Sequence, residues 1–183
     1  MRGLRIALVP YRRKFVDKYH LWMQDPYILE MTASEPLSLE EEYAMQVSWR
    51  DDDKKCTFII ISIEGEDGDK NKAEIESETY DYDYYISRMA GDVNLFFNDL
   101  DDSKVCEIEI MIAEERFRRQ GYASEALRMM MAYGVKELGV RRFYCKIHKT
   151  NEASIALFRK LGYSECNFVE AFGEFEYEMI VSE

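Results

Sequence analysis

The sequence predicts a mixed α/β domain built around one central sheet. Strand-like and helix-like segments alternate along most of the chain, and no internal repeat interrupts that order. A length of 183 residues with 47% hydrophobic and 14% aromatic content suffices for one sizeable core. We therefore expect one domain over residues 1–183.

The first third of the chain carries two expected strands with helices between them. Residues 3–9 alternate with branched side chains and end at Pro10, which predicts a strand. Residues 16–23 repeat apolar side chains at helical spacing, and a short helical extension follows at 27–31. Ser38 and Glu41 form a capping box that predicts a second helix. The β-branched run 56–63 then predicts a buried strand.

The rest of the chain predicts five more strands and two helices. Strands are expected at 91–97, 107–113, 142–148, 165–169 and 174–181. In the second of these, the isoleucines share one face, and Glu107, Glu109 and Met111 share the other. A helix over 123–138 ends at Gly139, and another over 151–161 begins behind Asn151 as its N-cap.

Charge is distributed unevenly along the chain. Residues 116–160 contain 11 Lys/Arg against 3 Asp/Glu, a net of +8, so the remainder must carry −20 to reach the formal net charge of −12. Residues 64–83 hold 9 acidic residues against 2 lysines, and we expect an acidic insertion over about residues 64–90. An acidic protein with one basic region is a poor nucleic-acid binder, but it suits a small polyphosphorylated ligand.

Cysteine and hydropathy patterns point to the cytoplasm. The four cysteines form no CxxC pair and lie far from the two histidines in sequence, which predicts reduced thiols and no metal site. The N-terminal stretch lacks the apolar run of a signal peptide, and the longest apolar run, 58–61, is too short for a bilayer. We expect a cytoplasmic protein without a membrane partner.

One strand–loop–helix unit carries the chemistry. The strand 107–113 leads through a loop into R-R-Q-G-Y-A at 118–123 and directly into a long helix. Free N–H groups at a helix N-terminus bind phosphate, and Gly121 lets the chain approach a ligand closely. Taken alone, this motif fits an ordinary basic helix start equally well. A second motif, N-E-A-S-I-A-L-F-R-K-L-G-Y at 151–163, follows directly after a strand.

The pair R-x-x-G-x-A and N-x-x-S-x-x-x-F-x-K-L-G-Y, in this order, resembles the two acetyl-CoA motifs of the GCN5-related N-acetyltransferase (GNAT) superfamily. The resemblance implies a mixed sheet of about seven strands flanked by four helices, with the fourth and fifth strands splayed. It also implies acetyl-CoA as co-substrate. The pyrophosphate would lie on Arg118, Arg119, Gln120, Gly121, Tyr122 and Ala123. Met111 and Ile112 would offer backbone groups to the pantetheine, and Asn151 and Ser154 would line its other side.

A narrower resemblance covers most of the chain outside the acidic insertion. T-A-S-E-P-L at 32–37, E-E-Y-A-M-Q at 41–46, G-D-V-N-L-F at 91–96 and E-I-E-I-M-I-A at 107–113 are similar to the N-acetyltransferase 9 branch. That branch implies a protein amine as acceptor, with tubulin as the proposed protein, and an association with microtubules.

Acetyl transfer to an amine needs a group that removes a proton from the ammonium. Glu109 is the first candidate and Glu107 the second, because both project beside the expected thioester. An acidic pair that simply stays in water is the alternative. A backbone N–H near Ile112 would hold the carbonyl oxygen.

The leaving group presents a departure from the family pattern. Many GNAT members carry a tyrosine that protonates the departing sulphur, and Phe158 stands at the matching position, so the resemblance also implies that Phe158 contacts acetyl-CoA. Either water supplies the proton or the thiolate leaves unassisted. Two other functions therefore stay open: a catalytically inactive acetyl-CoA-binding partner protein, and a polyamine acetyltransferase whose acidic surface attracts its cationic substrate.

Overall fold

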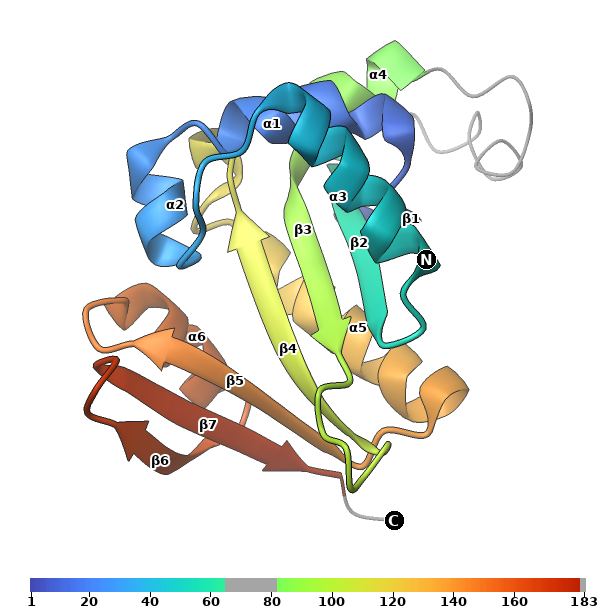
Figure 1. Ribbon diagram of the computed structural model, residues 1–183. Coiled ribbons are helices and arrows are strands. Elements are labelled where there is room, and N and C mark those ends of the chain that lie inside the picture. The colour runs from blue at the N-terminus through green and yellow to red at the C-terminus, as the bar shows by residue number, and fades with distance from the viewer. Residues whose placement is uncertain (65–81, 182–183) are drawn as a thin grey trace.

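The computed structural model describes residues 1–64 and 82–181, and its centre is a seven-stranded sheet in the order β1-β2-β3-β4-β5-β7-β6 (Figure 1). The strands are β1 (Ile6–Pro10), β2 (Lys55–Ser62), β3 (Met89–Phe96), β4 (Val105–Ile112), β5 (Arg142–His148), β6 (Ser164–Val169) and β7 (Glu174–Ile180). The α-helices are α1 (Val16–Trp22), α2 (Pro26–Met31), α3 (Leu39–Asp51), α4 (Tyr82–Ser87), α5 (Tyr122–Leu138) and α6 (Glu152–Lys160). Short 3₁₀ turns lie at Arg13–Phe15 and Glu115–Phe117.

The predicted fold class is confirmed, because β4 and β5 are parallel and the other neighbouring strands are antiparallel. The described residues form six α-helices rather than four. The short piece after α1 is a separate helix, α2, because the Asp25 side chain accepts a hydrogen bond from the Tyr27 N–H and caps a new N-terminus. The other additional helix is α4.

The expected acidic insertion ends earlier than residue 90. Residues 65–81 lie outside the described residues. After them, α4 packs through the buried Tyr85, and β3 already begins at Met89. Met89 and Ala90 are fully buried, so these apolar side chains belong to the core and not to a solvated insertion.

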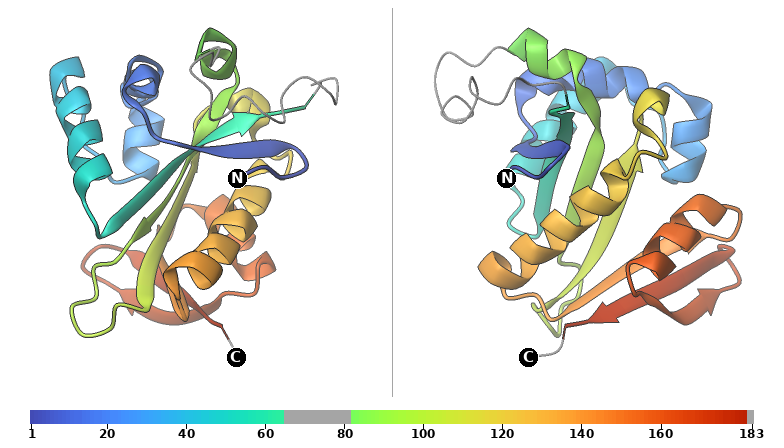
Figure 2. Two further views of the ribbon diagram at one scale, coloured as in Figure 1. Left: turned by 90° about the vertical axis from the view of Figure 1, so that its right-hand side faces the viewer. Right: turned by 180° about the vertical axis from the view of Figure 1, so that it is seen from behind.

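Helices cover both faces of the sheet. Figure 2 shows α1 and α3 on one face and α5 on the other. The buried cluster beneath α1 and α3 includes Val16, Tyr19 and Ile59, whereas the cluster beneath α5 and α6 includes Leu127, Phe143 and Phe158. Burial of these apolar faces on both sides fixes the sheet in the middle of the molecule.

The sheet opens between β4 and β5. The two strands pair only at Val105–Arg142, Cys106–Phe143 and Glu107–Tyr144, and beyond Glu107 they diverge (Figure 1). The remainder of β5 pairs with β7 instead. The predicted splay is therefore present, and it exposes one backbone edge of β4.

Gly91 allows β3 and β4 to approach each other beside this opening. A Cβ atom at residue 91 would lie 1.8 Å from the Met111 carbonyl oxygen and 2.8 Å from its carbonyl carbon. Because backbone atoms cannot move aside without disturbing the ladder, we expect Gly91→Ala to lower the free energy of unfolding by about 3 kcal/mol.

Chemical denaturation of the two proteins would measure this loss. Gly134→Ala serves as the contrast, because its new Cβ would meet mainly side-chain atoms, of Phe143 at 3.0 Å and Leu95 at 3.3 Å, that can shift. A Gly91→Ala protein as stable as the original would contradict the close approach.

Candidate active site

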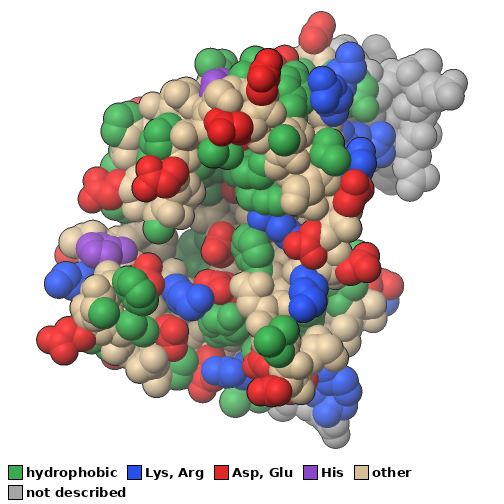
Figure 3. Space-filling view, viewed as in Figure 1, with side chains coloured by type: hydrophobic (Ala, Val, Ile, Leu, Met, Phe, Trp, Pro, Cys, Tyr) green, Lys and Arg blue, Asp and Glu red, His purple; other side chains and the backbone are tan. Residues whose placement is uncertain are grey.

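A cavity of about 470 Å³ lies where β4 and β5 separate. Its lining comes from α2, the end of β4, the loop before α5, the first turn of α5, and α6. Every residue predicted to contact acetyl-CoA lines it except Gln120 and Phe158. Figure 3 shows a hollow on the face seen in Figure 1, with acidic and basic side chains along its margin.

The N-terminus of α5 opens onto this cavity. Gly121 is its N-cap and adopts φ +86°, and Arg119 adopts φ +59°, so the chain turns sharply before the helix. The first helical hydrogen bond runs from the Glu125 N–H to the Gly121 carbonyl, which leaves the N–H groups of residues 122–124 without intrahelical partners. Those N–H groups and the helix dipole suit a phosphate.

The loop side chains are mostly engaged in holding the loop itself. The Arg118 guanidinium donates to the carbonyls of Ile112 and Ala113, both at 2.9 Å. The Gln120 amide donates to the Arg116 carbonyl. The Tyr122 hydroxyl lies 2.8 Å from Ser62 Oγ and 2.9 Å from Glu64 Oε2. The loop therefore presents its backbone to the cavity more than its side chains.

The α6 side of the cavity differs from the expectation at one residue. Asn151 caps α6 by accepting a hydrogen bond from the Ser154 N–H at 3.1 Å, and both residues line the cavity. Phe158 is only 2% exposed and packs edge-on against Tyr163 with ring centroids 4.9 Å apart. Phe158 is therefore a core residue, because the apolar stripe of α6 turns it toward the sheet.

Tyr163 does not replace the missing tyrosine at the sulphur. Its hydroxyl donates to Met131 Sδ at 3.1 Å, and the side chain is 4% exposed. Burial raises the pKa of the Tyr163 hydroxyl far above its usual value. Departure of the thiolate without a tyrosine stays a prediction.

Successive residues of β4 direct their backbone N–H and C=O groups to opposite sides of the strand. The Ala113 N–H bonds to Ala90 of β3. Since successive residues of a strand alternate, the backbone groups of Glu109 and Met111 also face β3, and those of Ile110 and Ile112 face the gap toward β5. Ile112 therefore directs its N–H toward the opening, while its carbonyl accepts a hydrogen bond from Arg118. The backbone of Met111, which was also expected beside the pantetheine, faces β3 instead. Both residues line the cavity.

Glu109 lies on the sheet face below α1 and α3. The residue as a whole is exposed to solvent, whereas its carboxyl group lies near enough to protein atoms to be partly desolvated. Desolvation, followed by the charges of Glu107 and Asp92, raises the pKa of Glu109 to about 7, while Lys55 and Lys146 oppose the rise. A carboxyl that titrates near neutral pH can accept a proton from an amine.

Glu107 has a different environment from Glu109. It is 6% exposed, and its Oε2 accepts a hydrogen bond from Lys146 Nζ at 3.0 Å. The alternative that both glutamates simply stay in water does not hold for Glu107, which stands opposite Tyr144 in the paired part of β4 and β5. Its contact with Lys146 leaves Glu109 as the more exposed carboxyl of the two and the one without an ion-pair partner within 4.0 Å among the described residues.

Several cavity residues were missed from the sequence. Tyr27, Ile28 and Met31 of α2, with Thr32 at its C-cap, form one wall, and Leu157 and Lys160 of α6 form part of another. The Asp25-Pro26 pair marks the start of α2, but only the three-dimensional arrangement shows that α2 lines the same cavity as the end of β4.

Three further features of the described residues concern metal sites, membrane-spanning helices and disulfide bonds. Residues 1–64 and 82–181 contain no group of three or more side chains able to hold a metal ion. None of the helices in these ranges is long and apolar enough to span a bilayer. Cys56, Cys106, Cys145 and Cys166 are free.

Comparison with known proteins agrees with this geometry. Residues 5–164 match the family model of the acetyltransferase (GNAT) domain. The N-acetyltransferase 9-like protein of Nematostella vectensis is 51% identical over 174 residues, covering 94% of this chain and 81% of the relative. Human alpha/beta-tubulin-N-acetyltransferase 9 is 42% identical over 182 residues, covering 99% of this chain and 83% of the relative.

A solved structure has the same fold. The spermidine N-acetyltransferase of Vibrio cholerae, in complex with CoA and spermine, superimposes with a TM-score of 0.75 at 16% identity, covering 96% of this chain and 95% of that chain. The chain is thus an acetyl-CoA-dependent N-acetyltransferase of the GNAT family. Within that family, it belongs to the N-acetyltransferase 9 branch.

Proposed function

We propose that this enzyme transfers the acetyl group to an amine of a protein acceptor, with α/β-tubulin as that protein. The observation that carries the acetyl-transfer chemistry is the position of Glu109, beside the opening in which the backbone of β4 is exposed. Support for tubulin comes from the names of relatives at about two-fifths identity over nearly the whole chain, including the human protein at 42%.

In the proposed reaction, Glu109 accepts the proton that the acceptor ammonium must lose, directly or through one water. The neutral amine attacks the thioester carbonyl, and a backbone N–H of Ile110 or Ile112 stabilises the developing oxyanion. The free amides at the start of α5 hold the pyrophosphate, and Asn151 and Ser154 flank the pantetheine. The carbon–sulphur bond then breaks and CoA leaves as thiolate, and the second proton that the attacking nitrogen loses passes through water to that thiolate.

Incubation with purified α/β-tubulin and acetyl-CoA tests this function. We expect stoichiometric release of CoA thiol and one acetyl group per modified amine, located by mass spectrometry of tubulin peptides. That location would also decide between an N-terminal amine and a lysine.

Spermine and spermidine serve as competing acceptors in the same assay. Turnover with spermine but none with tubulin would replace the proposed acceptor by a polyamine. Retention of acetyl-CoA without thiol release from any acceptor would instead indicate a binding protein. Because tubulin is cytoplasmic, the proposal also places the enzyme in the cytoplasm, in association with microtubules.

A further inference from the structure

Asp92 is a buried carboxyl close to Glu109. It lies on β3 and is only 3% exposed. In the β3–β4 ladder, Asn94 stands opposite Glu109, and Asp92 stands opposite Met111, one step along the same face. Asp92 and Glu109 are therefore diagonal neighbours across two strands.

Burial raises the pKa of Asp92 above its usual value, and the hydrogen bonds that this carboxyl accepts oppose the rise and favour its ionised form. Its Oδ2 accepts hydrogen bonds from the Tyr19 hydroxyl at 3.2 Å and from Asn94 Nδ2 at 2.9 Å, and its own backbone N–H also donates to it. Thr57 Oγ1 in turn donates to Asn94 Oδ1 at 2.6 Å, which fixes the orientation of that amide. A neutral carboxyl would need an acceptor for its own proton, whereas the Asn94 amide nitrogen and the backbone N–H can only donate, and the Tyr19 hydroxyl would have to reverse its hydrogen bond.

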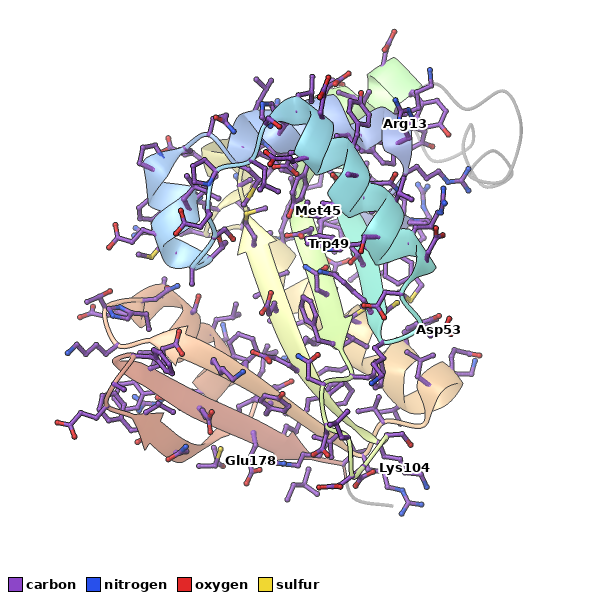
Figure 4. The ribbon with its side chains drawn as sticks, viewed as in Figure 1. Arg13, Met45, Trp49, Asp53, Lys104 and Glu178 are labelled. Carbon is purple, nitrogen blue, oxygen red and sulfur yellow. The ribbon has the colours of Figure 1, made fainter. Side chains whose placement is uncertain are left out.

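The negative charge of Asp92 lacks a contacting cation among the described residues, whereas Glu107 has Lys146 at 3.0 Å. Lys55 is the cation that influences Asp92, and it acts from a distance. Its ammonium lies 2.9 Å from the Trp49 ring centroid and 4.1 Å from that of Phe96. Figure 4 shows Trp49 on α3, above the sheet. Burial of a carboxylate that has only neutral hydrogen-bond partners is unfavourable. The presence of Asp92 at this position therefore points to a function other than stability.

We propose that Asp92 is a positioning residue for Glu109, and that its fixed charge, held by Tyr19 and Asn94, makes Glu109 a stronger base toward the acceptor ammonium. This inference rests on the proposed role of Glu109. The mechanism is electrostatic: a negative charge across the ladder disfavours a second negative charge on Glu109, and it therefore favours uptake of a proton.

The charged groups around Glu109 come from four strands. Glu107 on β4 and Asp92 on β3 raise the pKa of Glu109 together with desolvation, whereas Lys55 on β2 and Lys146 on β5 lower it. Lys146 already binds Glu107. Asp92 is therefore the neighbouring anion whose removal changes the charge around Glu109 without breaking an ion pair.

The decisive variant is Asp92→Asn, which removes the charge and keeps the shape of the side chain. We expect the acidic limb of the kcat/KM profile, measured as CoA release with α/β-tubulin, to move by about one unit to lower pH. Carbon-13 NMR of glutamate carboxyls, with the Glu109 signal identified by its loss in Glu109→Gln, should show the same shift without any acceptor. A Glu109 titration midpoint unchanged in Asp92→Asn would overturn the inference.

Thr57→Val is the matched control, because it removes the far end of the same hydrogen-bond chain and keeps the Asp92 charge. A purely structural network would affect both variants alike, with lower thermal stability and an unmoved pH profile. Glu109→Gln separates the two proposals. If the acidic limb persists in Glu109→Gln, Glu109 is not the base. If the limb is lost in Glu109→Gln but does not move in Asp92→Asn, Glu109 remains the base and only the proposed role of Asp92 is refuted.

Asp92→Asn could also prevent folding, so the unmodified protein provides a second measurement. The carbon-13 signal of the Asp92 carboxyl should report an ionised group throughout the range in which Glu109 titrates. A neutral Asp92 carboxyl in that range would overturn the inference.

Discussion

Replacement of Glu109 by glutamine is expected to lower kcat by about 10²- to 10⁴-fold, the usual contribution of a general base. Glutamine has nearly the same shape but cannot accept the ammonium proton. Binding of acetyl-CoA should not change, because Glu109 does not line the cavity that holds the predicted cofactor residues. Steady-state kinetics with tubulin, together with calorimetric titration of acetyl-CoA, would measure both quantities.

The pH dependence gives a second signature of the same residue. The base must be ionised, and its pKa is raised to about 7, so the activity of the unmodified enzyme should fall about tenfold per pH unit below neutrality. Glu109→Gln should lose that limb. Retained turnover with the limb intact would assign the base to another group. Glu107→Gln is a useful comparison, since Lys146 already binds this carboxylate.

Replacement of Gly121 by tryptophan is expected to abolish measurable binding of acetyl-CoA. The φ of +86° disfavours any side chain at this position, and a large ring would crowd the free amides at the start of α5. Calorimetric titration would measure the affinity. We expect the fold to survive, because Gly121 is exposed and the nearest atom to a new Cβ is the flexible Arg5 Nη1 at 3.5 Å.

Gly139 offers a matched position for this test. It also has positive φ, at +69°, but it closes the opposite end of α5 and has no atom within 4 Å of a new Cβ. Gly139→Trp should therefore carry the same kind of backbone strain and still bind acetyl-CoA. An unchanged affinity in Gly121→Trp would count heavily against a diphosphate site at the start of α5.

Much of the fold followed from local patterns in the sequence. The strand at 142–148 was predicted with the bounds of β5, and the capping box of Ser38 and Glu41 forms as expected. These features depend on neighbours within a few residues, which a sequence displays directly. The splay of β4 and β5 came from the family resemblance, since no local pattern describes where two strands part.

The parts that could not be predicted depend on contacts between distant residues. The pairing of Glu107 with Lys146 joins two strands, and the wall formed by α2 depends on how that helix packs. Phe158 illustrates the limit of transferring a motif, because the matching position in the sequence turns into the core. The burial of Asp92 likewise could not be predicted from the sequence, because it depends on residues that are distant along the chain, such as Tyr19.

In β4 the backbone hydrogen-bonding groups and the side chains point in perpendicular directions. Alternate backbone groups face the opening, and the intervening side chains carry the carboxyls. Deletion of one codon within this strand would exchange these sets, sending the glutamates to the opposite face and turning other amides toward the gap. Natural variation in length should therefore be tolerated in the turn between β6 and β7 but excluded from β4.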